Sequence, residues 1–179
     1  MEIHYCRATS KQELKQILQL QSVNLRSVIS SRESQKEGFV SVVHTLDLLE
    51  RMNKVAAHIV AKTGDIVVGY ALCMHPSFSD EIAMLKPMFD KVNTQLGPKH
   101  KFMIMGQICI AKQYRGKGIF RGLYKAMSEA LFPDYDSIVT EVDAHNQRSL
   151  QAHHAVGFSD IEVYRSGDRI WHLIQLKED

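Results

Sequence analysis

The sequence predicts an α/β (α+β) fold in which a mixed, largely antiparallel sheet of about seven strands is flanked by helices. Three observations predict it. The apolar period changes repeatedly between that of a helix and that of a strand. Two pairs of predicted strands are separated only by short turns, at 63–65 and 166–168, which makes each pair an antiparallel hairpin. A strand, a helix and a second strand follow one another from residue 101 to 142, and such a crossover makes the two strands parallel.

The first part of the chain contains two predicted helices and three predicted strands. A short edge strand at 3–7 precedes a helix that begins near Lys11, behind a capping box formed by Ser10 and Glu13. The polar stretch 30–38 is expected to be a loop or a frayed helix. A second helix follows Thr45, and strands are expected at 57–62 and 66–74.

The remaining elements follow from apolar runs and from helix stop signals. Residues 101–110 form a nearly continuous apolar run, which is typical of a central strand buried on both faces. A helix opens at Ile119 and ends before Pro133, and a strand is expected at 137–142. Asn146 caps a further helix that Gly157 ends. Two final strands are expected at 161–165 and 169–176.

Composition and length limit the class of protein. The 179 residues suit a single domain, 1–179, and a net charge of +2 argues against nucleic acid as the main partner. No apolar run approaches the roughly 20 residues that cross a membrane, and the N-terminus lacks the pattern of a signal peptide. The three cysteines, Cys6, Cys73 and Cys109, are expected to be reduced and buried, which favours a cytoplasmic location.

The segment 113–120 has the properties of an anion-binding loop. Gly116 and Gly118 let the backbone approach a ligand closely, and the loop ends where a helix starts, with unpaired amides and the positive end of the helix dipole. Arg115, Lys117 and Arg121 add positive charge, so the loop suits a diphosphate. A Gly-x-Gly pair alone fits equally well an ordinary turn with solvated basic residues. The pattern is neither a Walker loop nor a Rossmann fingerprint.

Two motifs together make the sequence resemble the GNAT superfamily of N-acetyltransferases. Gln113-x-x-Gly116-x-Gly118 is similar to the Q/R-x-x-G-x-G/A signature of that superfamily, between the expected strand and helix. A second segment, at matching spacing, is similar to its "LEV…N..A…Y…GF" pattern. The matching residues of this second segment are Thr140, Glu141, Val142, Asn146, Ser149, His153, Gly157 and Phe158.

The resemblance implies acetyl-CoA (coenzyme A) as cofactor. It also implies a β-bulge in the strand that ends at Ile110 and a splay between that strand and the strand at Val139, with pantetheine in the gap. Phe120 departs from the small residue common at its position. The cofactor-binding residues that the resemblance implies are Ile108, Cys109, Ile110, Gln113, Tyr114, Arg115, Gly116, Lys117, Gly118, Ile119, Phe120 and Asn146.

Two residues are candidates for proton transfer. The superfamily usually has a tyrosine acid where this sequence has His153, so we expect His153 to protonate the leaving thiolate, although the position also suits a merely polar helix residue. His154, Tyr114 and Tyr124 are substitutes, and a thiolate also leaves without a dedicated acid. Glu141 matches a glutamate that acts as base in some members, and an ordinary strand carboxylate is the alternative.

Residues 76–100 are expected to be an insertion that forms the wall of the acceptor pocket. Phe78 and Met84 are candidates for its apolar lining, and Asp80 and Glu81 for alternative bases or a clamp on a cationic substrate. The other interpretation packs the apolar residues onto the core and leaves the acidic ones solvated. A small-molecule amine is favoured over a protein N-terminus or lysine as acceptor, without a metal, and the chain is expected to be a monomer or a homodimer.

Three functions compete at this point. The leading one is an acyl-CoA-dependent N-acyltransferase that moves an acetyl group to a primary amine by direct attack in a ternary complex. The second is a catalytically silent acyl-CoA-binding sensor, because the usual tyrosine is absent at position 153. The third is a nucleotide-phosphate-binding module without acyl chemistry.

Overall fold

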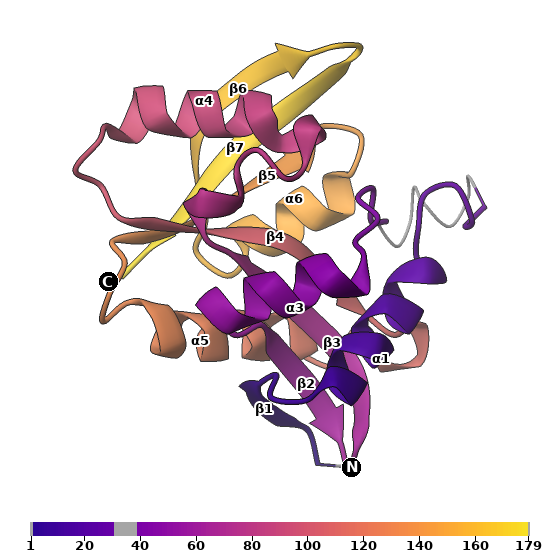
Figure 1. Cartoon of the computed structure of the whole chain (residues 1–179). Coiled ribbons are helices and arrows are strands. Elements are labelled where there is room, and N and C mark those ends of the chain that lie inside the picture. The colour runs from indigo at the N-terminus through magenta and orange to yellow at the C-terminus, as the bar shows by residue number, and fades with distance from the viewer. Residues whose placement is uncertain (1, 31–38, 179) are drawn as a thin grey trace.

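The computed structural model describes residues 2–30 and 39–178, which form a seven-stranded sheet with helices on both faces (Figure 1). The strands lie in the order β1-β2-β3-β4-β5-β7-β6, and every neighbouring pair is antiparallel except β4 and β5. The predicted fold class is therefore confirmed. The strands are β1 (His4–Arg7), β2 (Ile59–Thr63), β3 (Ile66–Met74), β4 (Phe102–Ile110), β5 (Ser137–Asp143), β6 (Ser159–Ser166) and β7 (Arg169–Lys177).

The helices also follow the predicted order. Residues 76–100 contain two 3-10 turns, Pro76–Phe78 and Ala83–Leu85, followed by the helix α4. Of the stretch 30–38 that we expected to be loop or frayed helix, residues 31–38 lie outside the described part of the chain. The α-helices are α1 (Lys11–Ser22), α3 (Leu46–Val55), α4 (Lys86–Leu96), α5 (Ile119–Leu131) and α6 (Gln147–His154).

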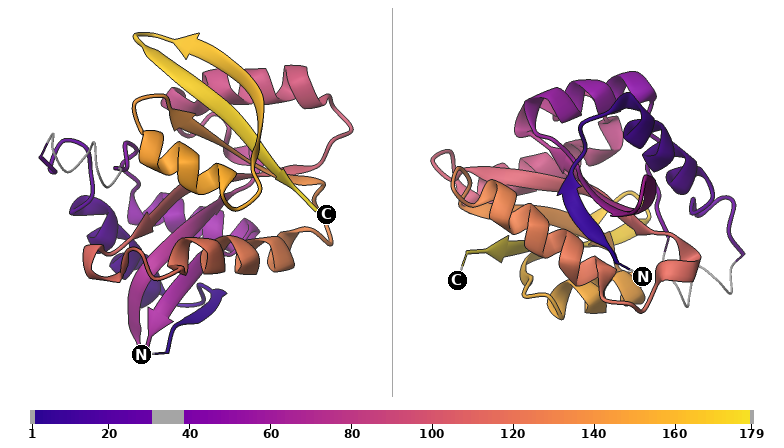
Figure 2. Two further views of the ribbon diagram at one scale, coloured as in Figure 1. Left: turned by 180° about the vertical axis from the view of Figure 1, so that it is seen from behind. Right: turned by 90° about the horizontal axis from the view of Figure 1, so that it is seen from below.

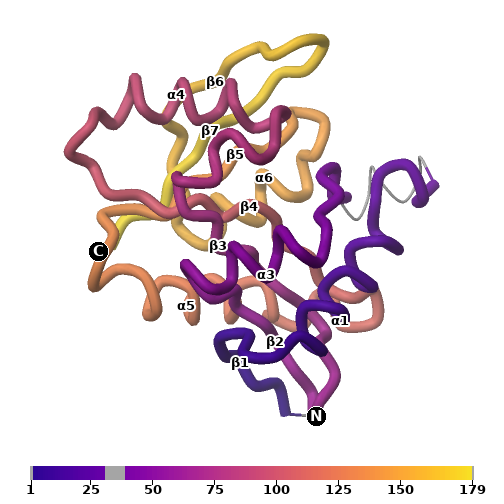
Figure 3. Tube along the Cα trace, viewed as in Figure 1, coloured from indigo at the N-terminus to yellow at the C-terminus, as the bar shows by residue number. Residues whose placement is uncertain are grey.

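The helices are divided between the two faces of the sheet. Figure 2 shows α5 and α6 on one face, and Figure 1 shows α1, α3 and α4 on the other. The trace in Figure 3 follows the crossover from β4 through α5 to β5. Each helix turns its apolar side to the sheet: Leu123 and Met127 of α5 are fully buried on one face, and Ile17 of α1 and Leu49 of α3 on the other.

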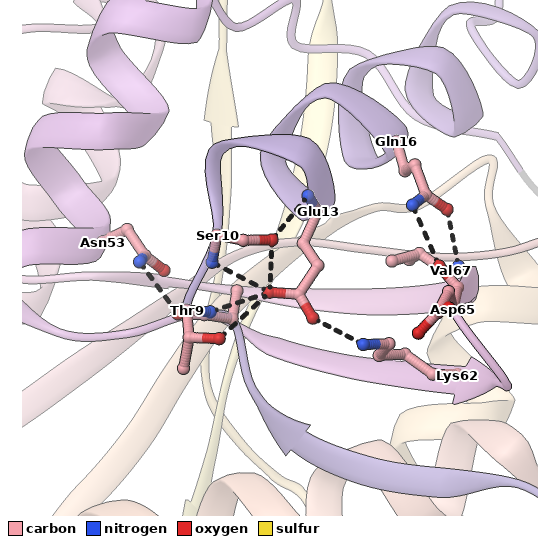
Figure 4. Close-up of polar contacts among 9 residues, drawn as sticks. Thr9, Ser10, Glu13, Gln16, Asn53, Lys62, Asp65 and Val67 are labelled. Atoms are coloured by element: carbon pink, nitrogen blue, oxygen red, sulfur yellow. Dashed lines mark hydrogen bonds and ion pairs between the residues drawn. The ribbon is translucent and has the colours of Figure 1, made fainter.

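The start of α1 is fixed by the predicted capping box (Figure 4). The Ser10 hydroxyl accepts from the Glu13 amide at 3.2 Å, and the Glu13 carboxylate accepts from the amides of Ser10 and Thr9 at 3.0 and 2.8 Å. Lys62 of β2 donates to the other carboxylate oxygen at 2.8 Å. Burial alone would raise the pKa of Glu13, but the hydrogen bonds from Lys62, Thr9 and Ser10 outweigh it and lower the pKa to about 2. This contact ties α1 to the sheet.

The centre of the sheet is open. Parallel pairing between β4 and β5 covers only three residue pairs, from Phe102↔Ser137 to Ile104↔Val139, after which β4 continues to Ile110 and β5 to Asp143. β4 also carries an extra residue opposite β3, because its partners step from Ile108 to Met105 while β3 advances only from Ala71 to Cys73. The bulge and the splay that the resemblance implies are thus both present.

Two expectations about composition can be compared with the structure. Cys73 and Cys109 are buried, but Cys6 is exposed on the edge strand β1, so the expectation of three buried thiols is wrong for Cys6. A strand at the edge of a sheet has a neighbouring strand on one side only, so its side chains have fewer neighbours to cover them on either face. Among the described residues, no helix has both the length and the apolar character needed to cross a membrane.

Candidate active site

Two cavities meet where β4 and β5 part. The large cavity has a volume of about 580 Å³ and lies beside the segment 113–120. The small cavity has a volume of about 100 Å³ and lies between the middle of β4, the C-terminal end of β5 and the insertion 76–100. The residues that line both cavities, and so mark their junction, are Phe39, Val40, Ile108, Asn146 and Ser149.

The glycine loop beside the large cavity presents unpaired amides. Gly116 and Gly118 have φ of +71° and +77°, a left-handed conformation that favours glycine. Gly118 is the N-cap of α5. Within the described part of the chain, no backbone carbonyl accepts from the amides of residues 116–121, and the first such bond of α5 runs from Gly122 to Gly118 O at 3.0 Å. These donors and the positive end of the helix dipole form an anion site.

One arginine that lines the large cavity is held in place by hydrogen bonds. The Arg115 guanidinium donates to Ile110 O at 3.1 Å and to Asn24 Oδ1 at 2.5 Å. Arg148, which is exposed, also lines this cavity. Lys117 instead lies over the Tyr114 ring, 5.3 Å from its centroid. The charge that faces the cavity therefore comes from two arginines, of which the sequence predicted Arg115.

Most of the predicted cofactor-binding residues line the large cavity, whereas Gln113, Tyr114 and Lys117 do not. The structure adds Ser149 of the second motif, and it adds lining residues that no sequence signal indicated: Asn24, Phe39, Val40, Arg148 and Ala152. The predicted residues that it does bring to the cavity are Ile108, Cys109, Ile110, Arg115, Gly116, Gly118, Ile119, Phe120 and Asn146.

Glu141 brings a carboxyl group to the small cavity from β5. It is partly buried and accepts a short hydrogen bond from the Tyr164 hydroxyl on β6. Burial raises the pKa of Glu141 to about 7, with the hydrogen bond from Tyr164 acting in the opposite direction. A carboxyl group with a pKa near neutrality suits a proton acceptor. Tyr164 was not predicted, because only the order β5-β7-β6 brings it near Glu141.

The rest of the small cavity is largely apolar. Met84, Leu85 and Met88 of the insertion form one wall, and Trp171 of β7 also lines it. The other polar lining includes Asp143, whose buried carboxylate lies 3.6 Å from the Arg26 guanidinium. Among the described residues, no lysine or arginine lines this cavity. It is therefore suited to a group without negative charge.

Of the four residues expected in an acceptor pocket, only Met84 lines the small cavity. Phe78 is buried in the core beneath the insertion, where it packs with the apolar residues of α3 and α4. Glu81 forms a surface ion pair with Arg51 of α3, at 2.7 Å. Asp80 is exposed and lies outside the lining. These three residues lie outside the small cavity because the 3-10 turns of the insertion direct them to the core, to solvent and to α3.

His153 is buried, with 1% of its surface exposed, and both ring nitrogens have partners. Nδ1 lies 2.7 Å from Ser149 O, a carbonyl that can only accept, so Nδ1 carries the hydrogen. Nε2 then accepts from the Tyr124 hydroxyl at 2.7 Å. Burial lowers the pKa of His153 to about 4, so the ring is neutral at physiological pH. This arrangement leaves no ring N–H for a cofactor sulfur.

Asn146 joins α6 to the wall between the cavities. Its side-chain oxygen accepts from the Ser149 amide at 3.3 Å, which confirms the predicted helix cap. Its side-chain nitrogen donates to Phe39 O at 3.3 Å. The wall segment Phe39–Val42 was not predicted, since its residues lack a motif and only the fold brings them to the junction.

A family model matches most of the chain, and several solved structures have a similar fold. The model of the "Acetyltransferase (GNAT) family" matches residues 16–158. A comparison with curated protein sequences gives no significant match. The fold is similar to the NatC complex bound to Gag peptide and CoA (TM-score 0.67, 16% identity, 100% of each chain covered). It is also similar to Naa50 of Arabidopsis thaliana in complex with the bisubstrate analogue CoA-Ac-MVNAL (TM-score 0.66, 14% identity, 99% of this chain and 100% of that chain covered). A third similar structure is yncA of Salmonella typhimurium with acetyl-CoA (TM-score 0.63, 15% identity, 99% of this chain and 94% of that chain covered).

Proposed function

Because the chain belongs to the acetyltransferase (GNAT) family, we propose that it transfers an acetyl group from acetyl-CoA to a primary amine by direct attack in a ternary complex. One observation carries this proposal. The parting of β4 from β5 joins a large cavity with an anion site to a small cavity with a carboxyl group of near-neutral pKa. An acyl donor and an amine thus have separate places that meet at one point.

The large cavity has the chemistry that coenzyme A needs. The free amides of residues 116–120 would hold its diphosphate, with Arg115 and Arg148 beside them. The edge of β4 from Ile108 to Ile110 has no β5 partner, so the backbone groups there that are bonded neither to β3 nor to Arg115 are available to the amides of pantetheine. The cofactor supplies the activated acetyl thioester, and the chain orients it.

Glu141 acts as the general base in this proposal. It takes a proton from the ammonium form of the acceptor, directly or through a water, so that a neutral amine attacks the thioester carbonyl. A backbone N–H of β4 at the junction stabilises the negative charge that develops on the carbonyl oxygen. The C–N bond forms, the nitrogen loses its second proton to water, the C–S bond breaks, and the sulfur leaves as a thiolate.

We do not assign the role of general acid to His153, because its ring N–H already donates to Ser149 O and its second ring nitrogen accepts from the Tyr124 hydroxyl. A thiol with a pKa near 8.5 leaves readily as a thiolate and takes its proton from water. His153 serves in this proposal to hold α6 against α5. That role replaces the one expected from the superfamily's tyrosine.

The acceptor is a small-molecule amine with a compact apolar body. A cavity of about 100 Å³ with methionine and tryptophan walls accommodates such a group, and the carboxyl groups of Glu141 and Asp143 disfavour acidic acceptors. The NatC and Naa50 structures contain a peptide and a peptide-like analogue, so an N-terminal amine is the second candidate. A cytoplasmic location and a monomeric or homodimeric state stay predictions.

Release of free thiol from acetyl-CoA in the presence of single amines tests the proposal. We expect turnover with short apolar primary amines and none with acidic ones such as glutamate. Calorimetry should show tighter binding of coenzyme A than of ATP. Binding of coenzyme A without turnover of any amine would favour the silent sensor, and equal binding of ATP would favour a nucleotide-phosphate module.

A further inference from the structure

The extra residue of β4 lies at the junction of the two cavities. Gly106 and Gln107 occupy the register shift between Met105 and Ile108, and both line the small cavity. Directly after them, β4 provides the unpaired edge that faces the gap. The conformation of this short stretch therefore decides where the backbone N–H groups of Ile108 to Ile110 point.

The side chain of Gln107 is buried, with 7% of the residue exposed, and its amide group makes three hydrogen bonds. Its nitrogen donates to Val42 O at 2.9 Å. Its oxygen accepts from the Tyr70 hydroxyl at 2.6 Å and from the Gln21 side-chain nitrogen at 2.8 Å. Because a carbonyl can only accept, the contact with Val42 fixes which end of the Gln107 amide is the donor.

Gln21, near the end of α1, extends this network to the next part of the wall. Its side-chain oxygen accepts from the His44 amide at 2.9 Å, and its nitrogen also lies 2.8 Å from His44 Nδ1. The backbone amide of His44 can only donate, so the orientation of Gln21 is fixed as well. Two buried glutamines thus connect α1, β3, the bulge of β4 and the segment before α3.

The same turn of the chain reaches the large cavity through Asn24. Val40 and Asn24 are joined by a backbone hydrogen bond of 3.1 Å, and Asn24 Oδ1 accepts from Arg115 at 2.5 Å. Residues 21–24 therefore contact the β4 bulge on one side and the glycine loop on the other. The wall Phe39–Val42 lies between them and is held at both ends.

We propose that Gln107 is a positioning residue, which fixes the bulge of β4 and the wall Phe39–Val42 in one arrangement and so keeps the backbone N–H groups of β4 directed into the gap. This role rests on the proposed acetyl transfer. Gln107 takes part in no bond-making or proton-transfer step; it acts through the backbone of its own strand and through Val42.

The test compares two glutamines whose side-chain nitrogen donates to a backbone carbonyl. Gln16 of α1 donates to Asp65 O at 3.0 Å and accepts from the Val67 amide at 2.8 Å, in the β2–β3 turn away from both cavities (Figure 4). In Gln107→Glu and Gln16→Glu alike, a carboxylate oxygen replaces an N–H donor that faces a backbone carbonyl. We expect kcat to fall by about tenfold or more in Gln107→Glu, with the KM for acetyl-CoA changed less than about threefold, and to stay unchanged in Gln16→Glu.

Hydrogen exchange gives a readout that does not depend on turnover. In Gln107→Glu the amides of 102–110 and 39–45 should exchange at least about tenfold faster, and those of 63–67 should not. If the wild type turns over no amine, the proposed function fails and exchange alone decides the role of Gln107. If Gln107→Glu does not fold, the alternative variant is Tyr70→Phe, which removes one hydrogen bond to Gln107. In that variant we expect kcat to fall several-fold and the amides of 102–110 to exchange faster than in the wild type. A folded variant with wild-type exchange in those peptides overturns the proposal.

Discussion

The large and the small cavity meet at one gap but are built in different ways. Residues from several parts of the chain line the large cavity, but its anion site is formed by one short segment around Gly116 and Gly118, whose donors are backbone amides. The small cavity is lined by residues from six separate parts of the chain: the wall Phe39–Val42, the insertion, β4, β5, α6 with its cap Asn146, and β7. A site made by the backbone of one segment depends on the local conformation of that segment, whereas a site made by side chains from distant segments depends on the whole fold.

Gly118→Asp tests the anion site of the large cavity, and of the variants considered it should have the largest effect. A carboxylate at the start of α5 repels the diphosphate, and like charges in close contact cost several kcal/mol, so we expect the affinity for coenzyme A to fall more than about 100-fold by calorimetry. Gly167→Asp is the matched control, because both glycines have a left-handed φ and open space where the first carbon of a side chain would lie. Wild-type affinity in Gly118→Asp would contradict the anion site.

Glu141→Gln tests the small cavity, which side chains form. Removal of a general base should lower kcat about 100-fold and leave coenzyme A affinity unchanged. With a Glu141 pKa of about 7, the base is protonated and inactive at low pH, so wild-type kcat should fall as the pH drops through 7.

Tyr164→Phe sharpens the assignment of Glu141. The hydrogen bond from Tyr164 lowers the pKa of Glu141, so its loss should move the acidic limb of the pH–rate profile to higher pH. Glu129→Gln, on the exposed face of α5, serves as control. An acidic limb that persists in Glu141→Gln would assign the titration to another group.

His153→Ala should change activity least and stability most. The variant leaves a cavity and removes the partners of the Tyr124 hydroxyl and of Ser149 O, so the free energy of unfolding should fall by about 2–5 kcal/mol. We expect kcat per folded molecule to stay within about threefold of wild type. Urea unfolding and active-site titration measure the two quantities, with His154→Ala as control. A tenfold loss of kcat per folded molecule would restore His153 as the acid.

The same difference explains what could be predicted from the sequence. The apolar run 101–110, the glycines at 116 and 118 and the cap at Asn146 are local signals, and the structure has the expected element at each. Gln107 could not be predicted as a network residue, because its partners are 37, 65 and 86 positions away in the chain. The exposed position of Asp80 and the ion pair of Glu81 likewise depend on contacts that only the folded insertion makes.

The short pairing of β4 with β5 has a consequence for the integrity of the domain. Only three residue pairs connect the two halves of the sheet through parallel pairing, yet apolar layers cross the opening on both faces. Met103 and Ile138 belong to one continuous layer, and Ile104 and Val139 belong to the other. Hydrophobic packing on both faces of the sheet, rather than a complete ladder of backbone hydrogen bonds, holds the two halves together. The strands β4 and β5 can therefore separate at the centre of the sheet without dividing the domain.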